Sequence, residues 1–184
     1  MSRASEGRVA KRYANALFNA AQRSQRTDAV QADLDGLMAA WNASADFRRL
    51  MLSPRIGVER KKSLVSQLFA ETTEPLTQRF LRLLIEKRRE DVLPAVQEEF
   101  QRRADDARGL LRATAMVATP ISPAEEEALR TSLAERTGRT VQLAVTVEPA
   151  IIGGVVVRMQ DTVLDGSIRG ALERIREHML QDRM

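Results

Sequence analysis

The spacing between apolar residues changes along this 184-residue chain, and that change constrains the fold more than any other feature. Up to about residue 107, apolar residues recur at helical spacing, which predicts amphipathic helices. In 111–117 and 141–147 they alternate with other residues, which is typical of half-buried strands. We therefore expect two domains, residues 1–107 and 108–184.

The first half contains helical patterns broken by capping residues and prolines. We expect an all-α six-helix bundle, in which a short turn of helix around 46–51 adds to five longer helical patterns. Ser53 and Thr73 lie just ahead of a proline, so we interpret both as helix starts. The longer predicted helices cover about 8–24, 27–44, 58–70, 75–87 and 91–107.

The second half predicts a small α+β domain in the order strand, helix, strand, strand, helix. Its first helix opens with a capping box, Ser122 to Glu125, and closes at Gly138. A third strand enters through Gly153-Gly154, and a helix over about 167–181 ends the chain.

Composition excludes several kinds of site. The chain has no Cys and a single His, His178, which rules out disulfides, thiolate metal sites and histidine clusters. With 43% apolar and 29% charged residues, the chain is typical of a globular protein. It contains no apolar stretch long enough to span a bilayer and no pattern of a signal peptide, so we expect a bacterial cytoplasmic setting.

No constellation of residues indicates catalysis. Gly153 and Gly154 precede a strand and not a helix, so we interpret them, with Asp165, as parts of structural turns. Asp161 and Asp165 are four residues apart and could hold Mg²⁺ in a metal-dependent enzyme, but turn and cap roles fit them better. We predict no catalytic residue, no metal and no cofactor.

The charge of the chain leaves one alternative function open. A net charge of +4 and a pI of about 10.1 would suit an RNA- or ribosome-associated basic binding protein. The basic runs are interrupted by acidic residues, which favours solvated, ion-paired helix faces over a nucleic-acid surface.

Two of the predicted helices are apolar over more than one face. A surface helix needs a single apolar stripe, yet the first helix and the helix over 75–87 each carry apolar residues around most of their circumference. Such a helix lies centrally in its own bundle or contacts a partner. The second case predicts a groove between the two helices that receives an amphipathic helix.

Four segments carry a resemblance to a known family. They are Val9–Phe18, Leu52–Ile56 with the following Lys61-Lys62, Ile152–Arg158 and Asp165–Gly170. In this order they resemble the delta subunit of F-type ATP synthase, the bacterial counterpart of the mitochondrial oligomycin-sensitivity-conferring protein. The similarity covers nearly the whole chain, and its closing segment is the most specific part.

The resemblance implies a noncatalytic peripheral-stalk (stator) subunit without a cofactor. Such a subunit links the alpha/beta catalytic head to the b-subunit stalk, so that proton-driven rotation is coupled to ATP synthesis. It implies a hetero-oligomeric membrane complex, with this chain peripheral at the cytoplasmic face of the bacterial plasma membrane and binding no nucleic acid.

It also implies two partner sites. The family's first and fifth helices receive the N-terminal helix of an alpha subunit, which here implies Val9, Tyr13, Ala14, Leu17, Phe18, Phe80, Leu81 and Leu84. The family's second half binds the C-terminal end of a b subunit, which here implies Ile168, Leu172, Ile175 and Met179.

Overall fold

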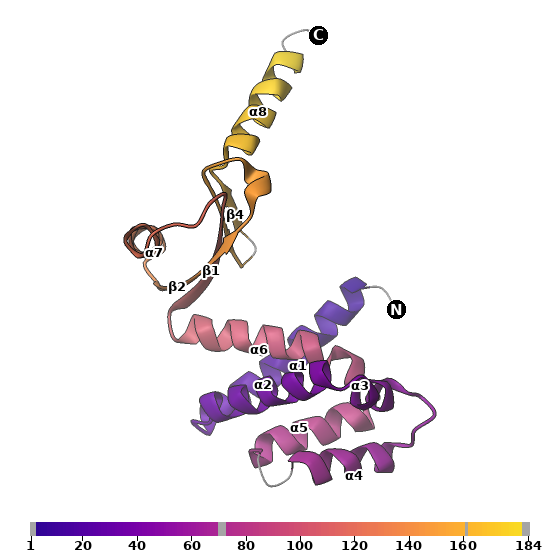
Figure 1. Ribbon diagram of the computed structural model, residues 1–184. Helices are drawn as coiled ribbons and strands as arrows, with labels where there is room; N and C mark the ends of the chain where they lie inside the picture. The colour runs from indigo at the N-terminus through magenta and orange to yellow at the C-terminus, as the bar shows by residue number, and fades with distance from the viewer. Residues whose placement is uncertain (1–2, 70–72, 161, 182–184) are drawn as a thin grey trace. The chain divides into compact units, whose positions relative to one another are not determined.

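The computed structural model describes residues 3–69, 73–160 and 162–181 (Figure 1). Within these ranges, the side chains of residues 3–6, 174–175 and 177–181 lie outside the description. The chain divides into two compact units, Met1–Ala104 (unit 1) and Asp105–Met184 (unit 2). The division falls inside a helix, whereas the composition of the sequence places it after residue 107.

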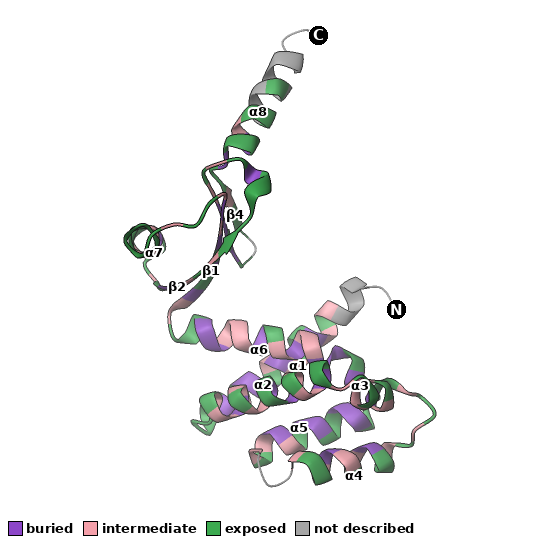
Figure 2. Cartoon of the chain, viewed as in Figure 1, coloured by how far each residue is buried: buried purple, intermediate pink, exposed green. Residues whose placement is uncertain are grey.

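Unit 1 is helical throughout its described part. In Figure 2 buried and exposed residues alternate along its helices, as amphipathic packing requires. Its elements are α1 (Arg3–Arg23), α2 (Thr27–Ala43), α3 (Ala45–Leu52), α4 (Val58–Phe69), α5 (Pro75–Glu86), the 3₁₀ turn η1 (Glu90–Val92) and α6 (Leu93–Ala107), which continues into unit 2.

One apolar core joins these helices. Leu34 of α2, Leu84 of α5 and Phe100 of α6 are almost completely buried in it. The Phe18 ring of α1 meets the Phe100 ring edge to face, with 5.7 Å between ring centroids. Burial of such side chains is the main stabilising contribution in a helical unit of this size.

Ser53 and Thr73 do not cap the helix starts that the sequence predicts for them. Ser53 is the C-cap of α3, and its hydroxyl accepts a hydrogen bond from the Arg55 backbone N–H at 3.4 Å. The Thr73 hydroxyl donates to the Phe69 carbonyl and does not cap α5. Instead, the Asp33 carboxylate of α2 accepts hydrogen bonds from the Glu74 backbone N–H at 2.8 Å and the Thr77 hydroxyl at 2.6 Å. A carboxylate distant in sequence therefore satisfies this helix end.

Unit 2 combines a four-stranded sheet with two helices. The strand order is β2-β1-β3-β4, with β1 and β2 parallel and the other pairs antiparallel. Its elements after α6 are β1 (Leu110–Val117), α7 (Pro123–Thr137), β2 (Thr140–Val147), the 3₁₀ turn η2 (Pro149–Ile151), β3 (Val155–Met159), β4 (Thr162–Asp165) and α8 (Ile168–Gln181).

The fourth strand corrects the predicted order, which contained three strands. β4 has four residues and ends at Asp165, so it is too short to show a two-residue repeat. Its pairing with β3, with Val157 opposite Leu164, becomes visible only in the folded sheet.

Helix α7 covers one face of the sheet. Leu133 of α7 joins Leu111, Ala115 and Val157 in a small buried cluster. The helix begins with the predicted capping box, in which the Ser122 hydroxyl accepts from the Glu125 backbone N–H and the Glu125 carboxylate accepts from the Ser122 backbone N–H. It ends at Gly138, whose φ of 67° is left-handed.

Candidate functional site

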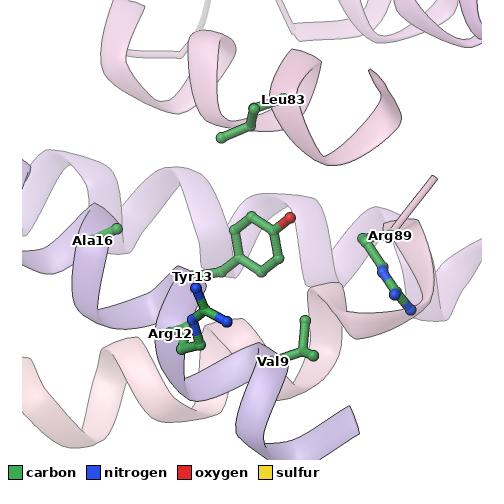
Figure 3. Close-up of a pocket in the computed structure, with 6 residues that line it drawn as sticks. All are labelled: Val9, Arg12, Tyr13, Ala16, Leu83 and Arg89. Atoms are coloured by element: carbon green, nitrogen blue, oxygen red, sulfur yellow. The ribbon is translucent and has the colours of Figure 1, made fainter. Parts of the chain in front are cut away.

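An open groove lies between α1 and the C-terminal end of α5 (Figure 3). Its volume is about 420 Å³. Four of its lining residues come from one face of α1, because positions 9, 12, 13 and 16 follow helical spacing. The lining residues are Val9, Arg12, Tyr13, Ala16, Leu83 and Arg89.

Tyr13 lies at the centre of the groove (Figure 3). Its ring packs edge to face on the ring of Phe80 from α5, with centroids 6.3 Å apart and an interplanar angle of 70°. This contact holds the ring against the core, while Tyr13 itself stays only partly buried. Leu83 of α5, 39% exposed, provides the opposite apolar wall.

Most of the predicted groove residues lie in the core instead. Of the eight, only Val9 and Tyr13 line the groove. The other six have exposed fractions of 8% or less, because they face neighbouring helices of the same unit: Ala14, Leu17, Phe18, Phe80, Leu81 and Leu84.

Four lining residues were missed by the sequence reasoning. Arg12 and Ala16 share the i, i+3, i+4, i+7 stripe with Val9, and this spacing could have identified them. Leu83 lies on the α5 face that turns away from the core. Arg89 follows the helix, and no sequence pattern places it beside α1.

The segment that carries Arg89 is held on both sides. Before it, α5 ends in a Schellman-type turn: Arg88 has a left-handed φ of 52°, and the Arg89 N–H bonds the Leu84 carbonyl at 2.9 Å. After it, Glu90 forms a buried ion pair with Lys61 of α4 at 2.7 Å, with both side chains 8% exposed or less. The backbone at Arg89 is therefore fixed relative to α4 and α5.

Two lysines of the first basic run in unit 1, Lys61 and Lys62, pair with carboxylates of the same unit. Besides Lys61, Lys62 bonds Glu86 at 2.8 Å and Glu59 at 3.2 Å. The hydrogen bond with Lys62 lowers the pKa of the Glu86 carboxyl, and the hydrogen bond with Glu86 raises the pKa of the Lys62 ammonium. Such pairing opposes the RNA-binding alternative, because a phosphate-binding face needs cations that converge on the ligand.

The Gly153–Gly154 segment of unit 2 leaves no room for side chains. A Cβ at Gly154, whose φ is 80°, would lie 2.3 Å from the Gly166 carbonyl oxygen. A Cβ at Gly153 would lie 2.6 Å from the end of the Ile168 side chain. Gly154 needs glycine because its backbone is left-handed and the Gly166 backbone packs directly on it, whereas a Cβ at Gly153 would only require the Ile168 side chain to shift.

Asp165 organises the start of α8. Its carboxylate accepts hydrogen bonds from the Ser167 N–H at 2.9 Å and the Ser167 hydroxyl at 2.6 Å. The Ser167 hydroxyl accepts from the Gly170 N–H at 3.0 Å. A Cβ at Gly170 would lie 2.5 Å from the Asp165 carboxylate. Ser167 is therefore the N-cap of α8, and Asp165 supports it through an Asx turn, which is a turn role and not that of a metal ligand.

The residues predicted to contact the stalk lie on α8. Ile168 is 50% exposed and Leu172 is 55% exposed. The side chains of Ile175 and Met179 lie outside the described residues. A second hollow of about 320 Å³ lies near the C-terminal end of β1 and is partly lined by Ile152, which is 64% exposed.

The described part of the chain offers neither a metal-binding cluster nor a membrane-spanning helix. No group of three or more acidic, His or Cys side chains there is arranged to hold a metal ion. Over the same residues, no helix combines the length and apolar character that crossing a bilayer requires.

Comparison with known proteins identifies the family. The ATP synthase delta (OSCP) subunit family matches residues 9–179. The chain is 34% identical to an ATP synthase subunit delta of Desulfitobacterium hafniense (strain DSM 10664 / DCB-2) over 95% of this chain and 97% of that protein. It is 35% identical to the one of Geobacillus sp. (strain WCH70), over 94% and 97%.

A solved structure shares the fold. A chain of the Toxoplasma gondii mitochondrial ATP synthase hexamer superposes with a TM-score of 0.74 at 23% identity, covering 93% of this chain and 97% of that one. By family match and by full-length similarity, this chain belongs to the ATP synthase delta (OSCP) subunit family, the noncatalytic peripheral-stalk component of F-type ATP synthases.

Proposed function

We propose that the groove between α1 and α5 receives the N-terminal helix of an ATP synthase alpha subunit. The observation that carries this proposal is the groove itself, an open apolar site in a unit whose other large apolar side chains are mostly buried. Helix-in-groove recognition requires such a concave apolar surface between two helices. Unit 1 is then the six-helix bundle of the family and the attachment point for the catalytic head.

Three properties of the groove support a helical occupant. It is walled by two helices, so an apolar stripe can lie between Val9 and Leu83. Ala16 has a small side chain, which permits close approach of another helix at one end. Tyr13 presents a ring that the Phe80 contact already orders, so binding costs little side-chain entropy.

We further propose that unit 2 binds the C-terminal end of a b subunit. Ile168 and Leu172 are large, exposed and one helical turn apart, so they form an apolar stripe on the first half of α8. Ile175 and Met179 continue that stripe in sequence. The chain then links head to stalk at the cytoplasmic face of a bacterial membrane, and coupling of rotation to ATP synthesis depends on both contacts.

Calorimetry with a synthetic peptide tests the groove. The peptide is the N-terminal segment of the alpha subunit from the same organism, titrated into the full chain. Tyr13→Asp should weaken binding at least about tenfold, since a carboxylate in an apolar site loses its hydration. Asn19→Asp, also exposed on α1 but outside the groove, is the charge-matched control and should bind as the wild type does.

Two results would remove the proposal. One is the absence of binding to the wild-type chain, and the other is equal affinity of the Tyr13→Asp variant with an unchanged circular dichroism spectrum. Leu17→Asp is not a suitable test, because Leu17 is 3% exposed and its replacement would damage the core.

A further inference from the structure

The two edges of the sheet in unit 2 differ in length and in chemistry. The strand order β2-β1-β3-β4 leaves β2 at one edge and β4 at the other. β4 has four residues and ends at the charged Asp165, whereas β2 has eight residues, none of them charged and none a proline. Free strand edges are normally kept short or carry a charge or a proline, because their unpaired backbone groups can bind another strand. β2 has none of these protections.

The hydrogen bonds to β1 show which backbone groups of β2 point outward. The Thr140 N–H donates to the Gly109 carbonyl at 3.0 Å, and the Glu148 N–H donates to the Val117 carbonyl at 2.7 Å. Successive residues of a strand direct their backbone groups to opposite sides, so the even-numbered residues of β2 face β1. Among the described residues, no hydrogen-bond partner reaches the outward groups of the odd-numbered ones. These residues are Val141, Leu143, Val145 and Val147.

The side chains of β2 divide between the two faces of the sheet. Val141 belongs to the buried cluster under α7, and Leu143 packs against that cluster. The side chains of Gln142, Ala144 and Thr146 point to the opposite face and are exposed. A strand that adds to this edge must therefore place apolar side chains on the α7 face and small or polar ones on the other face.

A second copy of β2 meets this requirement on the α7 face. In an antiparallel pair centred on Ala144, Val141 lies opposite Val147 of the second copy, and Leu143 lies opposite Val145 of the second copy. The residues whose backbone groups point outward then face one another. Their N–H and C=O groups can pair across the contact without any change in the hydrogen bonds to β1.

The other face of the same pair is also matched. Gln142 lies opposite Thr146 of the second copy, and Ala144 lies opposite Ala144. Glu148, the first charged residue after the strand, lies opposite Thr140 of the second copy and not opposite Glu148. No like charges therefore meet across the contact, whereas a parallel pair would place the two Glu148 side chains together.

The antiparallel contact closes on itself. The combined sheet has the strand order β4-β3-β1-β2-β2-β1-β3-β4, so both of its outer edges are the short β4. A two-fold contact of this kind uses the same surface on both copies and stops at a dimer. It covers the long edge without creating another one.

We propose that two copies of the free chain associate through an antiparallel β2–β2 contact with its two-fold axis at Ala144. The contact protects the long edge of the sheet from other strands. It involves neither the α1–α5 groove nor the apolar stripe of α8, so it is independent of the proposed function. A contact between two strand edges is smaller than a standard interface, and we therefore expect association in the micromolar range.

Sedimentation velocity of the full chain over a range of concentrations tests the register of the contact. Ala144→Lys and Ala144→Glu each place two like charges opposite each other and should weaken dimerisation about threefold to tenfold. An equimolar mixture of the two variants should recover the dimer, because Lys then lies opposite Glu. Ala128→Lys, at an exposed position of α7 outside the β2 edge, is the control and should dimerise as the wild type does.

A cross-link tests the same register by a second method. The chain has no cysteine, so Ala144→Cys introduces a single thiol. In the proposed pair the two residues at position 144 are not hydrogen-bonded to each other, and their Cα atoms lie about 4.5 Å apart, within the range that a disulfide spans. Mild oxidation should convert Ala144→Cys to a covalent dimer much faster than the control Ala128→Cys.

Three results would overturn the proposal. One is a wild-type chain that stays monomeric at about 1 mM, since its affinity would then be too weak to matter. The second is a dimer that Ala144→Lys leaves unchanged, because another surface then forms the contact. The third is equal cross-linking of Ala144→Cys and Ala128→Cys, as expected if the edge binds a strand of a different protein. Ala144→Lys should bind the alpha-subunit peptide as the wild type does, so these outcomes do not affect the groove.

Discussion

Unit 1 and unit 2 are stabilised by different kinds of contact. The described core of unit 1 is one cluster of twenty buried apolar residues, whereas the cluster under α7 in unit 2 has seven. Unit 2 depends instead on close backbone contacts, such as Gly154 against Gly166. Unit 1 therefore gains stability from the amount of buried apolar surface, and unit 2 from the fit of short segments.

The same contrast extends to their exposed surfaces. Among the described residues of unit 1, Leu52 is 46%, Leu68 53% and Leu83 39% exposed, and Leu83 lies within a concave groove with charged edges. In unit 2, Ile152, Val163, Ile168 and Leu172 are each at least half exposed. A protein that exposes this many large apolar side chains in a small unit has surface to bury against partners.

The largest expected effect tests the core of unit 1. Phe100→Ala should lower the free energy of unfolding by about 3 to 5 kcal/mol, because it leaves a cavity at a site with 0% exposure. Trp41, the single Trp of the chain, lies in the core of unit 1, so its fluorescence during urea unfolding reports on that unit. Leu83→Ala is the control and should change the midpoint little. A small effect of Phe100→Ala would contradict the contrast between the units.

The next effect concerns the buried ion pair of unit 1. Lys61→Met should destabilise the unit by about 3 kcal/mol, since it leaves the Glu90 carboxylate buried without its cation. The double variant Lys61→Met/Glu90→Leu should recover much of this loss, because neither charge then remains. If the double variant is no more stable than Lys61→Met, the cost arises from packing and not from charge.

A smaller effect tests whether the stability of unit 2 depends on close backbone contacts and not on the size of its apolar core. Gly154→Ala should destabilise unit 2 by about 2 kcal/mol, because it places a Cβ against a carbonyl oxygen at a left-handed backbone position. Hydrogen exchange measured by mass spectrometry should show faster exchange in β3, with α2 and α5 unchanged. Gly109→Ala, also left-handed but with open space around its Cβ position, should cost less. Equal costs would show that the close contact is unimportant.

The smallest expected effect is a dependence of stability on pH in both units. The pKa of Glu86 is lowered by its hydrogen bond with Lys62, and that of Glu125 by its bond with the Ser122 N–H. Because the folded-state values lie below the unfolded ones, both contributions are present above the ordinary carboxyl range and are lost as pH falls through the folded-state values. Glu86→Gln should flatten the pH dependence of the stability of unit 1, measured by Trp41 fluorescence. Glu125→Gln should flatten the pH dependence of the stability of unit 2, measured by hydrogen exchange in α7. Glu126→Gln on α7 is the control for the second variant, and an equal flattening there would contradict the assignment.

Much of the secondary structure could be predicted because it depends on local residues. The capping box at Ser122 and the left-handed Gly138 are confirmed, since each depends on residues within one helical turn. The cap of α5 by Asp33 could not be predicted, because forty-one residues separate Asp33 from the Glu74 N–H that it binds. The short β4 could not be predicted either, because its pairing partner defines it.

The groove shows where periodicity fails as a guide to a site. Apolar spacing correctly identified α1 and α5 as helices with broad apolar faces, but it does not say which face meets a neighbouring helix. Leu17 and Leu84 therefore turned out to be core residues, while Leu83 remains partly exposed. Arg89 was missed because it reaches the groove through the turn at Arg88 and not through a helical repeat.

The strand order of unit 2 has a consequence for synthesis of the chain on the ribosome. β1 is central in the sheet, yet its two neighbours, β2 and β3, end thirty and forty-two residues later in the sequence. Unit 1, which ends at Ala104, can complete its short-range contacts before either neighbour has been made. A nascent chain that stops before Val155 holds β1 with one hydrogen-bonding edge open, and this is the stage at which a chaperone or a second nascent chain would find a strand to pair with.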